Sequence, residues 1–363
     1  MKAYDITSRQ IEIPYLLKIG KGKIAKVGKY LFDKGMTKIA LFKGEGIENI
    51  IGMPLRNGLK EWGIEIAYEQ TVSTVDIDSV THTAFFLPPV GAIVGIGGGK
   101  TLDFAKYAAH LLKIPFISIP TAISNDGFSS PSSSLTVLDK RKSVKAGIPY
   151  GVVIDLDVVK DSPDIFMYAG IGDTLSKITA LKDWQLARDK GLARYVDFSA
   201  VLAYNSLDIL FLKHSFDIHS ESFQRSLASS LTMSGLAMEI AGSSRPASGS
   251  EHLISHALDS VLETPKMHGI QVGVATYLCA LLQKNEHAEG IKLVFEKTGF
   301  LTCVQENPFR YEEFIEALRI APTIKNNFYT ILSEPDSFDN ALHYIKNDGF
   351  LNTVILGGKT AIT

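Results

Sequence analysis

The chain has 363 residues, of which 45% are hydrophobic and 21% are charged, and its formal net charge is −2 at pH 7. This length is sufficient for two domains, and the near-neutral charge argues against binding to nucleic acid or attraction to an anionic membrane. The two cysteines, Cys279 and Cys303, lie in apolar stretches, and no run is long and apolar enough to cross a membrane. We therefore expect a cytoplasmic globular protein.

The first 160 residues alternate short β-branched runs with amphipathic patterns that are typical of helices. Each run has four or five residues and is bounded by glycine, proline or polar residues. The runs cover residues 38–42, 63–67, 92–96, 116–119 and 152–155. This alternation predicts a parallel sheet with crossover helices.

A glycine-rich loop, Gly97-Gly-Gly-Lys100, follows the third predicted strand and precedes an amphipathic helix over residues 101–112. Glycines at such a junction let a pyrophosphate approach the backbone N–H groups and the positive end of the helix. The loop matches neither the Walker pattern, which would need glycine at Val94, nor the Rossmann fingerprint, which would need glycine at Lys100. The loop therefore gives little support to a kinase or ATPase function. The alternative to a pyrophosphate-binding loop is a simple tight turn without a ligand.

A second polar loop, residues 120–130, follows the next strand and contains Thr121, Asp126 and Ser129. Loops at the carboxyl ends of adjacent parallel strands converge on one crevice, so we expect these side chains to face the ligand of the glycine loop. The alternative is a solvated loop built on the turn-forming Asn-Asp-Gly sequence.

After Pro163 the strand pattern stops, and apolar residues recur at spacings of three and four. Helices are predicted over residues 172–188, 197–214, 222–241, 251–262, 272–283 and 311–320. We therefore predict an α/β Rossmann-like domain over residues 1–160 and an all-α domain over residues 161–363.

Two histidines one helical turn apart, His252 and His256, are followed by His268, and Asp173 follows Gly170 and Gly172 at the start of a predicted helix. Residues at positions i and i+4 share a helix face, and a third imidazole with a carboxylate would complete a site for a divalent metal. Histidines that are hydrogen-bonded in the core, with Asp173 as a helix-end charge, explain the spacing about equally well.

Several blocks of this sequence together resemble the sn-glycerol-1-phosphate dehydrogenases. These are related to glycerol dehydrogenase, iron-containing alcohol dehydrogenases and dehydroquinate synthase. The matching blocks are residues 96–103, Pro120-Thr-Ala with Asp126, residues 169–173, Lys182-Asp-Trp184, residues 244–252 and His268-Gly269. The resemblance covers about residues 10–290 and implies a Rossmann-like domain and a helical domain with the active site between them.

The resemblance also implies roles for individual residues. Asp173, His252 and His268 would bind one divalent ion, zinc in the first place and otherwise nickel or iron, and His256 would line the substrate side. Residues of the glycine loop and the following helix would hold NAD or NADP, with Thr121 and Ser129 near the nicotinamide and Asp126 on a substrate hydroxyl. The dinucleotide-binding set is Gly97, Gly98, Gly99, Lys100, Thr101 and Asp103.

The expected reaction is the NAD(P)H-dependent interconversion of dihydroxyacetone phosphate and sn-glycerol-1-phosphate, by a homo-oligomeric enzyme. The rivals are a glycerol dehydrogenase acting on the free polyol and, more remotely, a lyase of the dehydroquinate synthase type. Lys43 could attract the 2′-phosphate of NADP, whereas Glu45 could bind the ribose of NAD. Lys182 and Arg245 are the candidates for binding the substrate phosphate.

Overall fold

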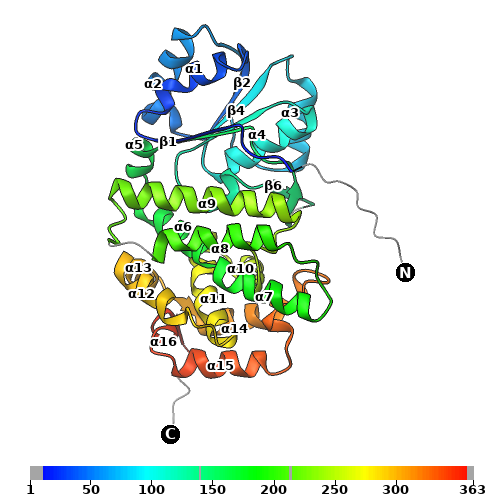
Figure 1. Cartoon of the computed structure of the whole chain (residues 1–363), viewed down its shortest axis with the longest axis vertical. Helices are drawn as coiled ribbons and strands as arrows, with labels where there is room; N and C mark the ends of the chain where they lie inside the picture. The colour runs from blue at the N-terminus through cyan, green and yellow to red at the C-terminus, as the bar shows by residue number, and fades with distance from the viewer. Residues whose placement is uncertain (1–10, 139, 212–214, 358–363) are drawn as a thin grey trace, which may run out of the picture.

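The computed structural model describes residues 11–138, 140–211 and 215–357. Its N-terminal part is a six-stranded sheet with helices on both faces, and its C-terminal part is helical (Figure 1). The long helix α9 (Glu221–Ala241) runs across the molecule between these two parts. The predicted fold class, an α/β part followed by an all-α part, is therefore confirmed.

The six strands are all parallel, in the order β1-β8-β5-β4-β2-β3. The five predicted strands are present. Their bounds are β2 (Lys38–Lys43), β3 (Glu65–Thr71), β4 (Ala92–Gly97), β5 (Phe116–Pro120) and β8 (Gly151–Asp155). The edge strand β1 (Leu16–Gly20) was not predicted, because its side chains are only partly buried and give a weak alternating pattern. The predicted start of β3 is two residues early, since Gly63 forms a turn with φ of 65°.

The two faces of the sheet are covered by different helices. Alternate side chains of β2 point to opposite faces, so Ile39 and Leu41 belong to one core and Ala40 and Phe42 to the other. Helices α1 (Val27–Phe32) and α2 (Ile47–Glu61) cover the first face, and α3 (Ile77–Phe86) and α4 (Gly99–Leu112) cover the second. An antiparallel hairpin that was not predicted, β6 (Ser132–Val137) and β7 (Lys140–Lys145), follows the second polar loop.

The helical part starts directly after β8. Its helices are α5 (Leu156–Lys160), α6 (Asp164–Leu175), α7 (Lys177–Asp189), α8 (Asp197–Phe211), α9, α10 (Ser250–Val261), α11 (His268–Leu282), α12 (Ala288–Thr298), α13 (Phe300–Glu306), α14 (Tyr311–Ile320), α15 (Ser337–Asn347) and α16 (Leu351–Val354). The strands β9 (Phe309–Arg310) and β10 (Ile355–Leu356) form a short parallel pair. The last three residues of the helix predicted over 197–214 lie outside the described residues.

One predicted helix, over residues 172–188, is wrong in its bounds. The structure has two helices there, which meet at Ser176. Asp173 therefore lies in the last turn of α6, and it does not open a helix. Glycine normally weakens a helix, but Gly170 and Gly172 are accepted within α6 because the backbones of neighbouring segments pack directly against them.

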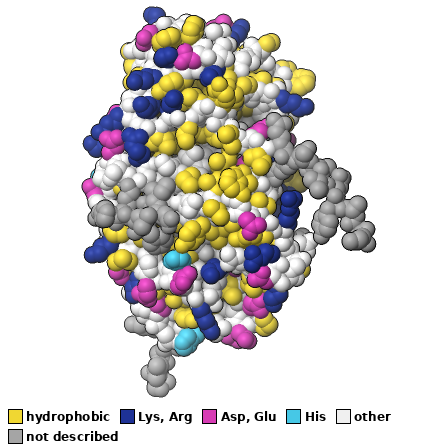
Figure 2. Space-filling model, viewed as in Figure 1, with side chains coloured by type: hydrophobic (Ala, Val, Ile, Leu, Met, Phe, Trp, Pro, Cys, Tyr) yellow, Lys and Arg dark blue, Asp and Glu magenta, His cyan; other side chains and the backbone are white. Residues whose placement is uncertain are grey.

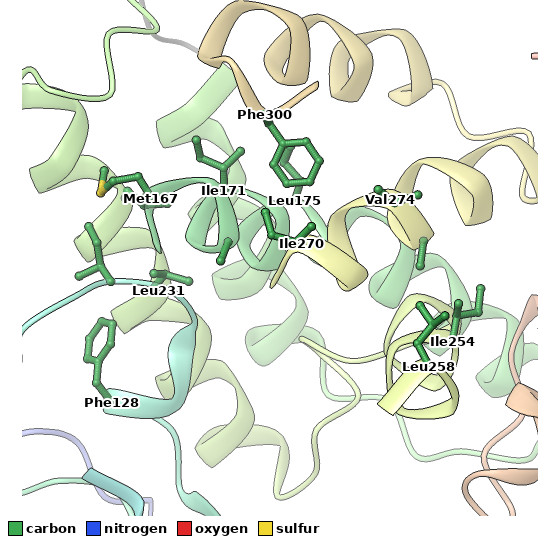
Figure 3. Close-up of a cluster of buried hydrophobic side chains, with 14 of the residues drawn as sticks. Phe128, Met167, Ile171, Leu175, Leu231, Ile254, Leu258, Ile270, Val274 and Phe300 are labelled. Atoms are coloured by element: carbon green, nitrogen blue, oxygen red, sulfur yellow. The ribbon is translucent and has the colours of Figure 1, made fainter. Parts of the chain in front are cut away.

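The sheet face covered by α4 shares one hydrophobic core with the helical part. Figure 3 shows this core, in which Phe128 from the second polar loop lies near Leu231 of α9 and Met167 of α6. Ile171, also on α6, packs there with Ile270 of α11 and Phe300 of α13. The division into domains at residues 160 and 161 stays a prediction.

Figure 2 shows hydrophobic side chains in a band down the middle of one face, with basic and acidic side chains on either side of it. Within the described residues, no helix is both long and apolar enough to span a bilayer.

Candidate active site

Asp173, His252 and His268 are brought together from three different helices. One ligand atom of each residue lies within 4.8 Å of the others. Nε2 of His252 is 3.6 Å from Oδ1 of Asp173, and the His252 and His268 rings have centroids 5.1 Å apart. Two imidazoles and one carboxylate are a donor set that suits a catalytic zinc ion and leaves positions open for a substrate. The three side chains therefore fit the divalent metal that the sequence predicts.

Glycines beside two of these residues explain how the helices come so close. A Cβ atom on Gly172 would lie 2.1 Å from the carbonyl oxygen of Gly269, and one on Gly269 would lie 1.9 Å from that of Ala169. Any other residue type would thus force α6 and α11 apart. Because Gly172 precedes Asp173 and Gly269 follows His268, this close packing also sets the distance between those two ligands.

Both imidazoles are oriented by hydrogen bonds to their second nitrogen. Nδ1 of His252 is 2.8 Å from Oε1 of Glu251, and Nδ1 of His268 is 3.2 Å from Oγ of Ser255. Glu251 is itself held by the backbone N–H of Gly249 and the hydroxyl of Thr179. These contacts leave Nε2 of each ring for a metal, which is the usual arrangement around metal-binding histidines.

The electrostatic environment favours an ionised carboxylate and a neutral imidazole at this centre. Burial opposes ionisation of Asp173, but Lys177 and the imidazoles of His252 and His268 lower the pKa of Asp173 well below its usual range. Burial, with His252 and His256 nearby, lowers the pKa of His268 to about 3. His252 is different, because its bonds to Asp173 and Glu251 outweigh burial and raise its pKa. His268 is thus in the protonation state that a metal requires.

Asp126 lies directly beside this cluster. Its backbone N–H donates to Oδ2 of Asp173 (3.1 Å), and its own carboxylate accepts from the hydroxyl of Ser234 (2.6 Å). The ammonium of the fully buried Lys177 lies 3.4 Å from Asp126 and 3.2 Å from Asp173, so it bridges the two carboxylates. Burial and the charge of Asp173 raise the pKa of Asp126.

His256 stands next to the cluster but is more open to solvent, with 40% of its side chain exposed. Its ring centroid is 5.8 Å from that of His268 and 6.4 Å from that of His252. Nδ1 of His256 faces Asp259 at 3.8 Å, and the partial burial of the ring lowers its pKa. His256 is therefore placed to contact a substrate at the edge of the metal centre.

The glycine loop has the predicted strand–loop–helix form. The buried strand β4 ends at Gly97, whose φ of 149° suits glycine alone, and α4 begins at Gly99. A Cβ atom added to Gly98 or Gly99 would meet nothing within 4 Å. No side chain caps this helix end, so its first N–H groups could receive a phosphate.

The remaining predicted cofactor residues differ in their surroundings. Lys100 is exposed, whereas Thr101 is buried and packs against Gly97. Asp103 is buried and lies 3.8 Å from Lys106, and this lysine donates to the carbonyl of Gly127 in the second polar loop and to that of Ser132 at the start of β6.

Ser129 is completely buried, and its hydroxyl donates to the carbonyl of Leu231 on α9. Its predicted contact with nicotinamide, like the cofactor role of Asp103, stays a prediction. In this structure both residues help to hold the second polar loop in place.

The segment from Thr121 to Asp126 joins the glycine loop to the metal-binding cluster. The N–H of Thr121 donates to the carbonyl of Gly97 at one end, and the N–H of Asp126 donates to Asp173 at the other. Five residues of chain span no more than about 18 Å. A dinucleotide held at Gly98 would therefore have its reactive end within reach of the metal centre.

Two lysines singled out in the sequence have other neighbours. Lys43 forms ion pairs with Glu48 (2.7 Å) and Glu69 (2.6 Å), so its charge is already balanced. Lys182 is exposed on α7 and lines a surface pocket of about 310 Å³ between α7 and α8. The lining of this pocket includes none of the metal-site residues, so Lys182 is not placed to bind the substrate phosphate.

Three residues near the site were missed by sequence reasoning. Lys177 follows Asp173 by four residues, and Glu251 precedes His252, so spacing could have suggested both. Lys325 gave no such signal, because it lies in a loop far along the chain. It reaches the segment before α10, where its ammonium is 3.5 Å from the hydroxyls of Ser244 and Ser248.

Comparisons with known proteins point in the same direction as this geometry. The family model for iron-containing alcohol dehydrogenase matches residues 18–163. A glycerol-1-phosphate dehydrogenase of Metallosphaera sedula, named as using NAD(P)+, is 36% identical, and the alignment covers 91% of this chain and 94% of that protein. The Thermococcus kodakarensis protein of the same name is also 36% identical, with 86% and 89% covered. The crystal structure of glycerol dehydrogenase from Schizosaccharomyces pombe shares the fold, with a TM-score of 0.74, 20% identity, and 95% and 91% of the two chains covered.

Proposed function

From its membership of the glycerol-1-phosphate dehydrogenase family, we propose that this chain is an NAD(P)-dependent oxidoreductase that interconverts dihydroxyacetone phosphate and sn-glycerol-1-phosphate. The observation that carries the proposal is the set of Asp173, His252 and His268, whose ligand atoms lie within 4.8 Å of one another. This set is joined by one short segment to a glycine loop of the kind that binds a dinucleotide.

Asp173, His252 and His268 would hold one divalent metal ion. When bound, the ion would stabilise the negative charge that develops on the substrate oxygen. The nicotinamide cofactor carries the hydride, so the task of the protein is to align cofactor and substrate and to manage the proton. Zinc suits this nitrogen and oxygen donor set, with nickel and iron as the alternatives.

The chain itself supplies the groups that position the substrate and handle the proton. Asp126 is half-buried between Ser234 and Lys177, where its carboxylate could accept a hydrogen bond from a substrate hydroxyl. His256 lies at the solvent side of the cluster and is neutral near pH 7, because its pKa is lowered. We assign to His256 the exchange of a proton between the substrate oxygen and solvent.

Activity assays on the purified protein would test the proposed substrate, cofactor and metal. Its activity would be measured with dihydroxyacetone phosphate and with unphosphorylated dihydroxyacetone, each with NADH and NADPH. The reverse reaction would be measured with glycerol-1-phosphate and with glycerol. Activity should be lost on chelation and restored by zinc, nickel or iron, and the phosphorylated substrate should be strongly preferred. A preference for glycerol over its phosphate would instead establish a glycerol dehydrogenase.

The choice between NAD and NADP depends on the ion pairs of Lys43. Because Glu48 and Glu69 already balance its charge, the 2′-phosphate of NADP must compete with two carboxylates. We propose that both cofactors are used, and that Glu48→Gln shifts the kcat/KM ratio towards NADPH. A ratio unchanged by this substitution would place the 2′-position of the ribose elsewhere.

We further propose that the protein acts in the cytoplasm as a homo-oligomer. Helix α8 carries Phe198 and Val201, whose exposed fractions are 67% and 56%, and such side chains are commonly covered by a second subunit. Light scattering of the purified protein would give its mass in solution, and a monomer would contradict the oligomer.

A further inference from the structure

Two cations meet beside the metal centre, although they come from distant parts of the chain. Arg245 lies before α10, and Lys325 lies in the loop that follows α14. Both pack on the ring of Phe328, with Cζ of Arg245 at 3.6 Å and Nζ of Lys325 at 4.6 Å from its centroid. The first turn of α10, which carries His252, follows Ser248, and the Ser248 hydroxyl is 3.5 Å from Nζ of Lys325.

Neither cation has an acidic partner. Across residues 11–138, 140–211 and 215–357, no carboxylate oxygen lies within 4.0 Å of Arg245 or Lys325, although other lysines and arginines in the structure do form such pairs. Glu251 and Asp183 are the acids whose charges act on this pair. Both are already engaged by backbone N–H groups, of Gly249 for Glu251 and of Ser250 for Asp183.

The guanidinium of Arg245 also makes few hydrogen bonds for a buried group. Its exposed fraction is 6%, and one of its five N–H donors, on Nη1, has an acceptor among the described residues, the carbonyl of Tyr329 at 2.7 Å. Burial lowers the pKa of both Arg245 and Lys325. Burying a cation without an anionic partner costs free energy of folding. We therefore expect this pair to bind an anionic ligand.

The ligand must be anionic, accept several hydrogen bonds and lie next to the metal centre. The ammonium of Lys325 lies 3.5 Å from the hydroxyl of Ser248, which precedes the metal-site residue His252 by four positions in the chain. A phosphomonoester meets these requirements, since it carries nearly two negative charges and three acceptor oxygens that match a guanidinium fork and an ammonium. We propose that Arg245 and Lys325, with the hydroxyls of Ser244 and Ser248, bind the phosphate group of the substrate.

This assignment rests on the proposed function, because it places the phosphate of dihydroxyacetone phosphate beside its reacting carbonyl. It also assigns a role to residues 324–329, the loop that carries Lys325 and Phe328. The loop holds the phosphate and thereby distinguishes phosphorylated from free substrates. The phosphates of the cofactor belong to the glycine loop, so changes at Lys325 should leave cofactor binding unaltered.

The test compares Lys325→Met with Lys182→Ala, which removes an exposed lysine that lines the pocket between α7 and α8. For Lys325→Met the KM of dihydroxyacetone phosphate should rise at least about tenfold, or about 1.4 kcal/mol. The KM values for unphosphorylated dihydroxyacetone and for NADPH should stay within about twofold of wild type. Lys182→Ala should leave all three values unchanged, and Lys325→Arg should restore most of the binding of dihydroxyacetone phosphate.

Binding of inorganic phosphate gives a second measurement that does not depend on turnover. Calorimetry with the wild-type protein should show phosphate binding that is lost in Lys325→Met and weakened in Arg245→Lys, which keeps the charge but not the fork. Equal KM changes for both substrates, or a change confined to NADPH, would overturn the assignment. If wild type bound phosphate at Lys325 but did not reduce dihydroxyacetone phosphate, the proposed function would fail while the anion site remained.

Discussion

Oε1 of Glu251 lies 2.8 Å from Nδ1 of His252, its neighbour in the sequence, and the carboxylate of Glu251 is fully buried. This contact fixes the ring of His252 so that Nε2 faces Asp173. The pair thus forms a carboxylate–histidine relay of the kind that strengthens a metal ligand.

Replacing Glu251 with glutamine keeps the size of the side chain but removes its charge. We expect the affinity for zinc to fall by about 10- to 100-fold, because His252 becomes a weaker and less constrained ligand. Competition with a chromophoric chelator would measure this loss. Glu286→Gln, the same change at an exposed glutamate, should leave the affinity unaltered, and an unchanged affinity in Glu251→Gln would remove the role assigned to that carboxylate.

Alanine at Gly269 should damage both the fold and the metal centre. The added Cβ would lie 1.9 Å from the carbonyl oxygen of Ala169, so α11 must move away from α6. We expect a loss of about 1–3 kcal/mol in the free energy of unfolding, together with weaker metal binding, because His268 moves with α11. Urea unfolding and metal titration would measure the two effects. Gly349→Ala, where the new Cβ meets nothing within 4 Å, is the matched control.

Alanine substitutions of the three histidines should distinguish the two metal ligands, His252 and His268, from the neighbouring His256. His252→Ala and His268→Ala should each lose most of the bound metal, since each removes one of three protein ligands. His256→Ala should retain the metal and lower kcat. Metal content by mass spectrometry, measured beside kcat, distinguishes these cases. Loss of metal from His256→Ala with retention in His252→Ala would reverse the assignment.

Replacing Gly98 with valine should weaken cofactor binding without lowering the stability of the fold. The new side chain would occupy the open space in front of α4, where a pyrophosphate would bind. We expect the Kd for NADPH to rise at least about tenfold, while the free energy of unfolding changes by no more than about 0.5 kcal/mol. Fluorescence titration and urea unfolding would test this. Unaltered NADPH binding would mean that the loop is only a tight turn.

The pH dependence of stability should reveal the buried carboxyl of Asp103. Burial raises its pKa to about 6 from an ordinary value of 3.8. The folded state therefore holds this proton more tightly than the unfolded state, so the contribution of Asp103 to stability is lost as pH rises from about 4 to about 6. The shift of about two units corresponds to about 3 kcal/mol.

Asp103→Asn cannot ionise, so its free energy of unfolding relative to wild type should increase by up to about 3 kcal/mol between pH 4 and pH 7. Denaturant unfolding of both proteins across this range measures the difference. A difference that stays constant with pH would show that Asp103 titrates normally.

Much of the architecture and part of the site could be predicted from local patterns. The β-branched runs predicted five of the six strands of the sheet, and the edge strand β1 escaped because its exposed side chains give little contrast. The glycine loop was predictable because three glycines between a strand and a helix have a direct conformational meaning. The one-turn spacing of His252 and His256, the later His268 and the glycines before Asp173 suggested a metal centre, although hydrogen-bonded core histidines were an equal alternative.

The direction of each side chain was decided by tertiary structure. Lys182 and Asp183 are adjacent in the sequence, yet α7 turns the lysine to solvent and buries the carboxylate against Ser250. Arg245 and Lys325 are far apart in the chain and meet only because their segments pack against the same phenylalanine ring. Local sequence encodes backbone preferences and helix faces, because these depend on neighbouring residues. The balance of charge around a buried group depends on every segment packed against it, so only the folded chain determines which cations are left for a ligand.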